Sequence, residues 1–149
     1  MYKKKDTTLE NIFYHIDNNM IIGESLEKFK KYLNEINILN YQDYIHFDDK
    51  TYKKNLVKRN QKIELYIICW KKGQSSSLHS HPKNGCLMKI LNGNLKEIIH
   101  KNKEIKSNIY NENQISYIHD KIGKHIIRSL DTDTISLHIY SPPKFYETN

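Results

Sequence analysis

Two histidines lie one residue apart in this chain, within the segment Ser-Ser-Leu-His79-Ser-His81-Pro. Side chains two positions apart on an extended chain point to the same side, so both imidazoles can face one ion. Two further histidines, His125 and His138, lie far downstream as candidate partners. Neutral imidazole binds iron, zinc, copper or nickel, so the set favours a metal centre. The His-x-His pair alone is a weak motif that also occurs in surface loops.

The expected ligands are all neutral. No carboxylate stands at the spacing typical of a site with two histidines and one acid, because Asn84 and Cys86 occupy the nearest candidate positions. Three imidazoles leave the double positive charge of a divalent ion uncancelled. Such a centre favours an anionic ligand, and a thiolate is a natural soft one. A structural zinc site is the alternative, but it needs a fourth ligand and only Cys86 is near.

A second polar set alternates with aliphatic residues further downstream. Ser136, His138 and Tyr140 share one face of an expected strand, because successive side chains of a strand point to opposite faces. Hydroxyl, imidazole and phenol can each donate and accept a hydrogen bond, so the three can form a relay. An outward-facing polar strand is the structural alternative. Ser141-Pro142 directly after it is a candidate cis peptide.

These residues need a scaffold, and the pattern from about residue 51 predicts strands to supply it. The expected strands cover residues 63–69, 87–91, 95–99, 104–110, 113–118, 124–130 and 134–140. Asn92-Gly93 between two apolar runs predicts a hairpin, because both central residues of its turn adopt positive φ. Many short strands at regular spacing predict a sandwich or barrel.

Residues 1–48 have a helical pattern instead. Two sets of apolar residues recur at helical spacing: Leu9, Ile12, Phe13 and Ile16, then Leu26, Phe29, Leu33 and Ile36. Thr7 and Glu10 predict a capping box at the first helix. We expect the helices to cover a barrel over 51–143, so that residues 1–149 form a single domain.

The composition argues against some partners. The net charge is +7, but the basic residues are nearly all lysines spread along the chain, with Arg59 and Arg128 the only arginines. There is no basic stripe or nucleic-acid-binding motif, so we do not expect a nucleic-acid partner. The sequence has no long apolar span and no signal-peptide core, which predicts no membrane partner and a cytoplasmic location. In that reducing compartment, Cys69 and Cys86 are not expected to form a disulfide.

Considered together, the motifs resemble those of the cysteine dioxygenases, thiol dioxygenases of the cupin superfamily. The resemblance covers 52–143, most of the chain, and the motifs follow in the family's order. They are Tyr52-Lys-Lys-Asn-Leu-Val57, Cys69-Trp70, Ser76-Ser-Leu-His79-Ser-His81, Cys86-Leu-Met-Lys-Ile-Leu-Asn-Gly93-Asn-Leu-Lys-Glu97, Ile122-Gly-Lys-His125 and Ser136-Leu-His-Ile-Tyr-Ser-Pro-Pro143. The implied fold is mainly β, a single-domain cupin β-barrel (jelly roll) with N-terminal helices packed against it.

The resemblance also implies an activity and a set of roles. It implies an Fe(2+) centre held by His79, His81 and His125, and oxidation of L-cysteine with O2 to cysteine sulfinate, a step of cysteine catabolism. The Ser-His-Tyr set corresponds to the family's relay. In it the hydroxyl of Tyr140 orients substrate or oxygen. His138 then holds the tyrosine and is not a fourth ligand.

Two positions qualify this expectation. Cys86 corresponds to a cysteine that eukaryotic members join to the relay tyrosine, which predicts a thioether crosslink to Tyr140; a free thiol is the alternative. Lys54 stands where the family has an arginine for the substrate carboxylate, with Tyr52 beside it. Lysine supplies the charge but not the planar fork of donors, so the exchange is not neutral.

The substrate therefore stays open. It is either cysteine or another small thiol, such as 3-mercaptopropionate or cysteamine. Two further alternatives are a cupin that binds metal without turnover and a basic protein that binds nucleic acid. The resemblance leads us to expect an enzyme that works as a monomer on a small thiol and O2.

Overall fold

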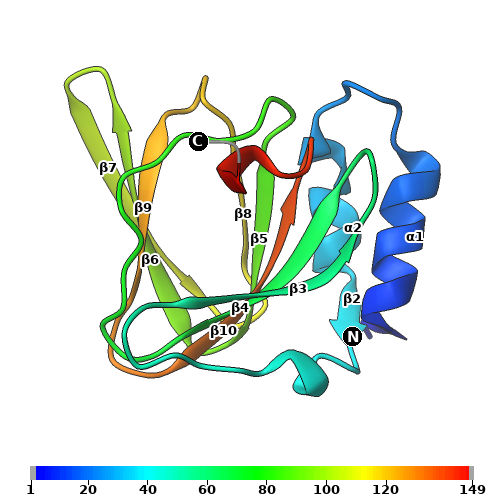
Figure 1. The fold of residues 1–149 in the computed structure, drawn as a ribbon, viewed down its shortest axis with the longest axis horizontal. Coiled ribbons are helices and arrows are strands. Elements are labelled where there is room, and N and C mark those ends of the chain that lie inside the picture. The colour runs from blue at the N-terminus through cyan, green and yellow to red at the C-terminus, as the bar shows by residue number, and fades with distance from the viewer. Residues whose placement is uncertain (1–2, 148–149) are drawn as a thin grey trace.

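The structure is a computed structural model that describes residues 3–147 (Figure 1). Helical segments dominate its first part and strands the remainder, as the sequence predicts. In chain order the elements are β1 (Lys5–Thr7), α1 (Leu9–Asn19), the 3-10 turn η1 (Leu26–Phe29), α2 (Lys30–Asn34), β2 (Ile36–Ile38), the 3-10 turn η2 (Gln42–Tyr44), β3 (Lys53–Arg59), β4 (Glu64–Trp70), β5 (Cys86–Asn92), β6 (Asn94–Lys101), β7 (Glu104–Asn111), β8 (Ile115–Ile118), β9 (Lys124–Ser129), β10 (Thr134–Tyr140) and the 3-10 turn η3 (Phe145–Glu147).

The strands of the barrel form two antiparallel sheets. One has five strands in the order β3-β4-β10-β5-β8, and the other has three in the order β7-β6-β9. A short parallel pair, β1 and β2, ties the beginning of the described chain to the segment after α2. The three-stranded sheet lies to the left of the five-stranded one in Figure 1. A core that includes Tyr66, Leu95 and Ile127 joins the inner faces of the two sheets.

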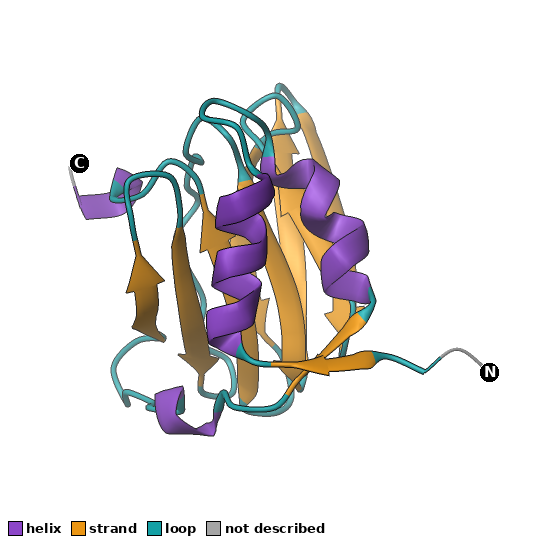
Figure 2. Cartoon of the chain, turned by 90° about the vertical axis from the view of Figure 1, so that its right-hand side faces the viewer, coloured by secondary structure: helices purple, strands orange, loops and turns teal. Residues whose placement is uncertain are grey.

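The helical segments cover the outer face of the five-stranded sheet (Figure 2). β4 shows why both layers are needed, because all seven of its residues are buried. Leu65 and Ile67 pack in a core shared with α1 and α2, whereas Tyr66 and Ile68 pack in the core between the sheets. The period of two in the sequence thus separates a structural face from a face that lines the interior.

The predicted hairpin at Asn92-Gly93 is wrong. β5 pairs with β10 and β8, while β6 pairs with β7 and β9, so the chain passes from one sheet to the other at this point. Gly93 has a φ of 88°. A Cβ at Gly93 would lie 2.4 Å from the Thr134 hydroxyl oxygen. The glycine is therefore required by a crossing between sheets and by close packing against β10, not by a two-residue turn.

The predicted capping box is also wrong by one position. Thr8 caps α1, and its hydroxyl accepts a hydrogen bond from the Asn11 amide at 3.2 Å. Thr7 belongs to β1. The carboxylate of Glu10 accepts from the Asn40 side chain instead, at 2.8 Å. Thr7 is paired with Ile38 of β2, so Thr8, the second of two adjacent threonines, is the residue that precedes the helix.

The structure also bears on the expected cis peptide, the two cysteines and the expected absence of a membrane-spanning helix. Ser141-Pro142 is a cis peptide. Cys69 and Cys86 are buried and free. Within residues 3–147, no helix has the length and apolar character needed to cross a membrane.

Candidate metal centre

His79 and His125 are held side by side by their own backbones. His79 lies in the long connection between β4 and β5, and His125 is on β9. The amide of each donates to the carbonyl of the other, at 3.1 Å in both directions. This single antiparallel bridge fixes one ligand from a loop against one from a strand. His81 follows two residues later, and Asp120 accepts from its amide at 2.8 Å.

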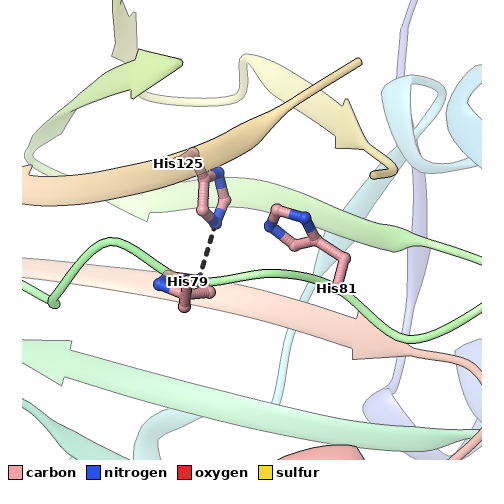
Figure 3. Close-up of side chains that lie close together, drawn as sticks. All are labelled: His79, His81 and His125. Carbon is pink, nitrogen blue, oxygen red and sulfur yellow. Dashed lines mark hydrogen bonds between the residues drawn. The ribbon is translucent and has the colours of Figure 1, made fainter. Parts of the chain in front are cut away.

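The three imidazoles converge on one point (Figure 3). Each offers a ring nitrogen, and these nitrogens all lie within 4.8 Å of one another. The ring centroids of His81 and His125 are 4.3 Å apart, and those of His79 and His125 are 4.5 Å apart. The structure thus brings together three of the four candidate histidines. His138 is not among them.

Each ring uses its Nδ1 atom away from the centre. The carbonyl oxygen of Ser77 lies 2.7 Å from His79 Nδ1. The carboxylate of Asp120 lies 3.3 Å from Nδ1 of His81, and that of Glu97 lies 2.6 Å from Nδ1 of His125. Carbonyl and carboxylate oxygens only accept hydrogen bonds, so all three Nδ1 atoms carry the proton.

That assignment leaves a lone pair on the Nε2 atom of a neutral ring. His79 Nε2 and His125 Nε2 face each other at 2.8 Å, and His81 Nε2 is buried without a hydrogen-bond partner. Burial lowers the pKa of His79 to about 4 and that of His81 to about 2, so neither ring is protonated at neutral pH. These two rings present Nε2 lone pairs next to the Nε2 atom of His125, and the donor set therefore fits a metal ion.

Sequence reasoning missed the two carboxylates behind the histidines. Glu97 is 1% exposed, and its other oxygen accepts from the Ser116 hydroxyl at 2.8 Å. The expectation of an uncancelled double charge needs correction, since two acids lie one ring away from the centre. Such partners fix ring orientation and raise ligand basicity. A signal was present, because Glu97 stands at strand spacing between the apolar residues Leu95 and Ile99.

The predicted relay is formed on the inner face of β10. Ser136 Oγ lies 2.8 Å from His138 Nε2, and the Tyr140 hydroxyl lies 3.3 Å from His138 Nδ1. Trp70, which sequence reasoning left without a role, donates to Ser136 Oγ at 3.0 Å. Burial lowers the pKa of His138 well below its usual value, which keeps the ring neutral.

The donor at one end is compatible with one direction of the relay. Indole N–H can only donate, so Ser136 Oγ accepts from Trp70, and its own proton remains available to His138 Nε2. When Ser136 donates to Nε2, the neutral His138 ring carries its proton on Nδ1 and can donate it to the oxygen of Tyr140. In that direction the Tyr140 O–H is left to donate elsewhere.

A cavity of about 190 Å³ connects the relay with the histidines. Its lining residues include two of the expected ligands, two residues of the relay and the expected substrate-binding residues: Tyr52, Lys54, Trp70, His79, His125, His138, Tyr140 and Tyr146. Tyr52 stacks on Trp70 with ring centroids 4.5 Å apart. Both predicted substrate-binding residues therefore face the same cavity as the metal centre. Tyr146 also forms part of the cavity wall, and the sequence analysis did not predict this role.

Cys86 does not line this cavity and is only 2% exposed on β5. Burial raises the pKa of its thiol. β5 is hydrogen-bonded to β10, which carries Tyr140 at its end. A buried, protonated thiol thus lies beside the relay rather than in the cavity.

The sequence matches a known family over nearly its whole length. Residues 9–148 match the profile described as Cysteine dioxygenase type I. The Bos taurus protein named Cysteine dioxygenase type 1 is 40% identical in an alignment 120 residues long, which covers 73% of this chain and 60% of the bovine protein. The Danio rerio protein of the same name is 34% identical in an alignment 116 residues long, which covers 70% of this chain and 58% of the Danio rerio protein. The chain therefore spans less than two thirds of these relatives.

Solved structures that are distant in sequence share the fold. A cupin superfamily protein of Desulfitobacterium hafniense has a TM-score of 0.57 at 11% identity, over 70% of this chain and 90% of that chain. A Klebsiella pneumoniae protein with a double-stranded beta-helix domain has a TM-score of 0.57 at 13% identity, over 70% and 84%. These similarities confirm the expected mainly β cupin fold with N-terminal helices.

Proposed function

Because this chain belongs to the cysteine dioxygenase type I family of the cupin superfamily, we propose that it is an Fe(2+)-dependent dioxygenase of small thiols. L-Cysteine is the leading substrate and cysteine sulfinate the product. One observation carries the proposal: three imidazole nitrogens converge beside a cavity that is also lined by a tyrosine relay and a lysine.

The roles of the residues follow from their contacts. His79, His81 and His125 hold the iron, while Glu97 and Asp120 keep two of the rings in the required tautomer. Bound ferrous iron supplies a centre at which a thiol sulfur and dioxygen meet and exchange electrons.

Tyr140 acts as a hydrogen-bond donor in the cavity. The relay directs a proton from His138 to the tyrosine oxygen, so the phenol O–H is free to orient the substrate or oxygen. Burial raises the pKa of Tyr140 well above its usual value, which keeps the phenol protonated. Ser136 and His138 act through Tyr140 and position it.

Lys54 supports a substrate that carries a carboxylate. Its ammonium lies at the cavity and, among residues 3–147, pairs with no carboxylate within ion-pair distance. Lys54 is half-buried, and a cation withdrawn from water without an acid partner is costly, so a substrate anion would compensate it. This feature keeps 3-mercaptopropionate as a second candidate, since that thiol has the carboxylate but lacks the amine.

Product analysis tests the proposal. The iron-loaded protein is incubated aerobically with cysteine, 3-mercaptopropionate or cysteamine, oxygen uptake is followed, and products are identified by mass spectrometry. We expect sulfinate from cysteine, with two oxygen atoms added per sulfur. The variant His79→Ala is the matched control and should lose both iron and activity. An iron-loaded protein that oxidises none of the three thiols would overturn the proposal.

A further inference from the structure

The turn η3 lies against the metal centre through one side chain, Tyr146. The Tyr146 hydroxyl donates at 2.8 Å to the carbonyl of Ser80, the residue between the first two ligand histidines. Its ring packs edge-on against those of His79 and Tyr140, with centroids 5.7 and 5.3 Å away. Tyr146 therefore contacts the ligand loop and the relay at once and forms a wall of the cavity.

The same ring helps to enclose Lys54. The lysine Nζ lies 4.6 Å from the ring centroid of Tyr66, 4.9 Å from that of Tyr140 and 4.6 Å from that of Tyr146. Ring faces attract a cation without neutralising it, so the ammonium is held in place with its charge available. Two of these rings come from barrel strands, and η3 supplies the third.

A charged network anchors η3 to the barrel. The Arg59 guanidinium contacts Glu147 at 2.5 Å and Glu64 at 2.8 Å. It also donates to the Tyr66 hydroxyl at 2.9 Å. Arg59 thus joins Glu147, the residue next to Tyr146, to Tyr66, another of the rings around Lys54. The position of η3 and the enclosure of the lysine depend on each other.

We propose that Tyr146 is a specificity-determining residue that closes the cavity over Lys54 and restricts the enzyme to free small thiols. The inference rests on the proposed function. A free thiol acid ends in the carboxylate that Lys54 attracts, whereas a cysteine at the start of a peptide continues as an uncharged amide and a further residue. Tyr146 lines the cavity next to Lys54, so the additional residue meets its ring.

The test compares L-cysteine with the dipeptide cysteinylglycine. Thiol binding to the iron-loaded protein is measured without oxygen from the fluorescence of Trp70, the only tryptophan of the chain, which lines the cavity. Turnover of both thiols is measured separately in air. Tyr146→Ala should weaken cysteine binding about tenfold and reduce the preference for cysteine over the dipeptide by at least as much. Tyr146→Phe, which keeps the ring, should retain most of the preference.

Tyr14→Ala is the matched control. Tyr14 also contacts a lysine, with Lys58 Nζ 4.2 Å from its ring centroid, but it lies outside the cavity. Its removal should leave the preference unchanged. Glu147→Gln provides a second route if Tyr146→Ala folds poorly, because Glu147 is exposed and the variant loosens η3 without removing the ring. It should reduce the preference about twofold to threefold.

The outcomes separate the two proposals. A wild-type protein that oxidises cysteine, with Tyr146→Ala and Glu147→Gln both keeping its full preference, overturns the role of Tyr146 and leaves the proposed function intact. A wild-type protein that neither binds nor oxidises any thiol overturns both. A preference lost in Tyr146→Ala and kept in Tyr146→Phe supports the inference.

Discussion

Cys86 and Tyr140 are directly opposed in the antiparallel register of β5 and β10. Cross-strand partners have their Cβ atoms about 4.5–5.5 Å apart, so thiol and phenol ring lie on the same face within reach of each other. Both residues are buried, at 2% and 6% exposed. We propose a thioether between the two residues, and their direct pairing across the strands supports it.

The crosslink predicts a measurable mass change. Forming a carbon–sulfur bond removes the thiol hydrogen and one ring hydrogen, and the two electrons and two protons go to dioxygen. The protein should therefore contain a fraction that is two hydrogen atoms lighter and migrates differently on a denaturing gel. Cys86→Ala should lack that fraction, whereas Cys69→Ala should retain it. A wild-type protein found entirely at the mass calculated from its sequence, with no fraction two hydrogen atoms lighter, would remove the idea.

Glu97 should contribute to metal affinity without touching the metal. In Glu97→Gln the buried charge behind His125 is lost, and the amide can present an N–H where the imidazole needs an acceptor. We expect iron affinity to fall by about tenfold to a hundredfold, measured by competition with a chelator. Glu104→Gln, on the neighbouring strand β7 and exposed, is the control and should bind iron normally. Equal affinities would contradict the role of Glu97.

Lys54 should distinguish thiols by their carboxylate. In Lys54→Met the KM for cysteine and 3-mercaptopropionate should rise about tenfold to a hundredfold, the range expected for loss of a charge-assisted hydrogen bond. Cysteamine, which has no carboxylate, should show little change. Lys54→Arg should restore binding of both acids, because a guanidinium also contacts carboxylates. An equal effect on all three thiols would assign Lys54 to cavity shape instead.

The direction of the relay can be tested at its far end. In Ser136→Ala, His138 loses the donor that keeps its proton on Nδ1, so the ring can change tautomer and accept from Tyr140. We expect kcat to fall about threefold to tenfold with KM nearly unchanged, as for loss of one neutral hydrogen bond. Tyr140→Phe should reduce kcat further, because it removes the donor itself. A Ser136→Ala enzyme with wild-type kcat would contradict the assignment.

The histidines should make the metal-free protein sensitive to acid. Burial lowers the pKa of His79 to about 4 and of His81 to about 2, below the ordinary value of 6.5. Between pH 6.5 and pH 4 the unfolded chain therefore binds more protons than the folded chain, and the free energy of unfolding decreases as the pH falls. The largest slope is about 1.4 kcal/mol per pH unit for each histidine.

Thermal unfolding in the presence of a chelator measures this dependence. The midpoint should be lower at pH 5 than at pH 7, and the difference should shrink in the variant His79→Gln. A midpoint that is the same at both pH values would show that the two rings are protonated equally in the folded and unfolded states.

The period of the hydrophobic pattern predicted where strands occur better than it predicted which strands pair with each other. The alternation along residues 63–69 identified β4 and its two faces, because burial on each face follows side-chain direction. Asn92-Gly93 did not specify which strands pair, because a glycine with positive φ serves a crossing between sheets as well as a hairpin. Strand pairing is decided by contacts between distant residues.

The sequence by itself determined the chemistry of the centre: residue types and spacing supplied three imidazoles, a relay with period two and a cysteine in a cupin of the cysteine dioxygenase family. Residue spacing left His125 and His138 both open, and the family resemblance implied His125; the tertiary structure supplied the physical reason, since a backbone bridge places His125 beside His79 and β10 places His138 in the relay. It also decided that Glu97 and Asp120 orient the rings and that Tyr146 encloses Lys54. These contacts join residues 28 to 92 positions apart, which no local pattern encodes.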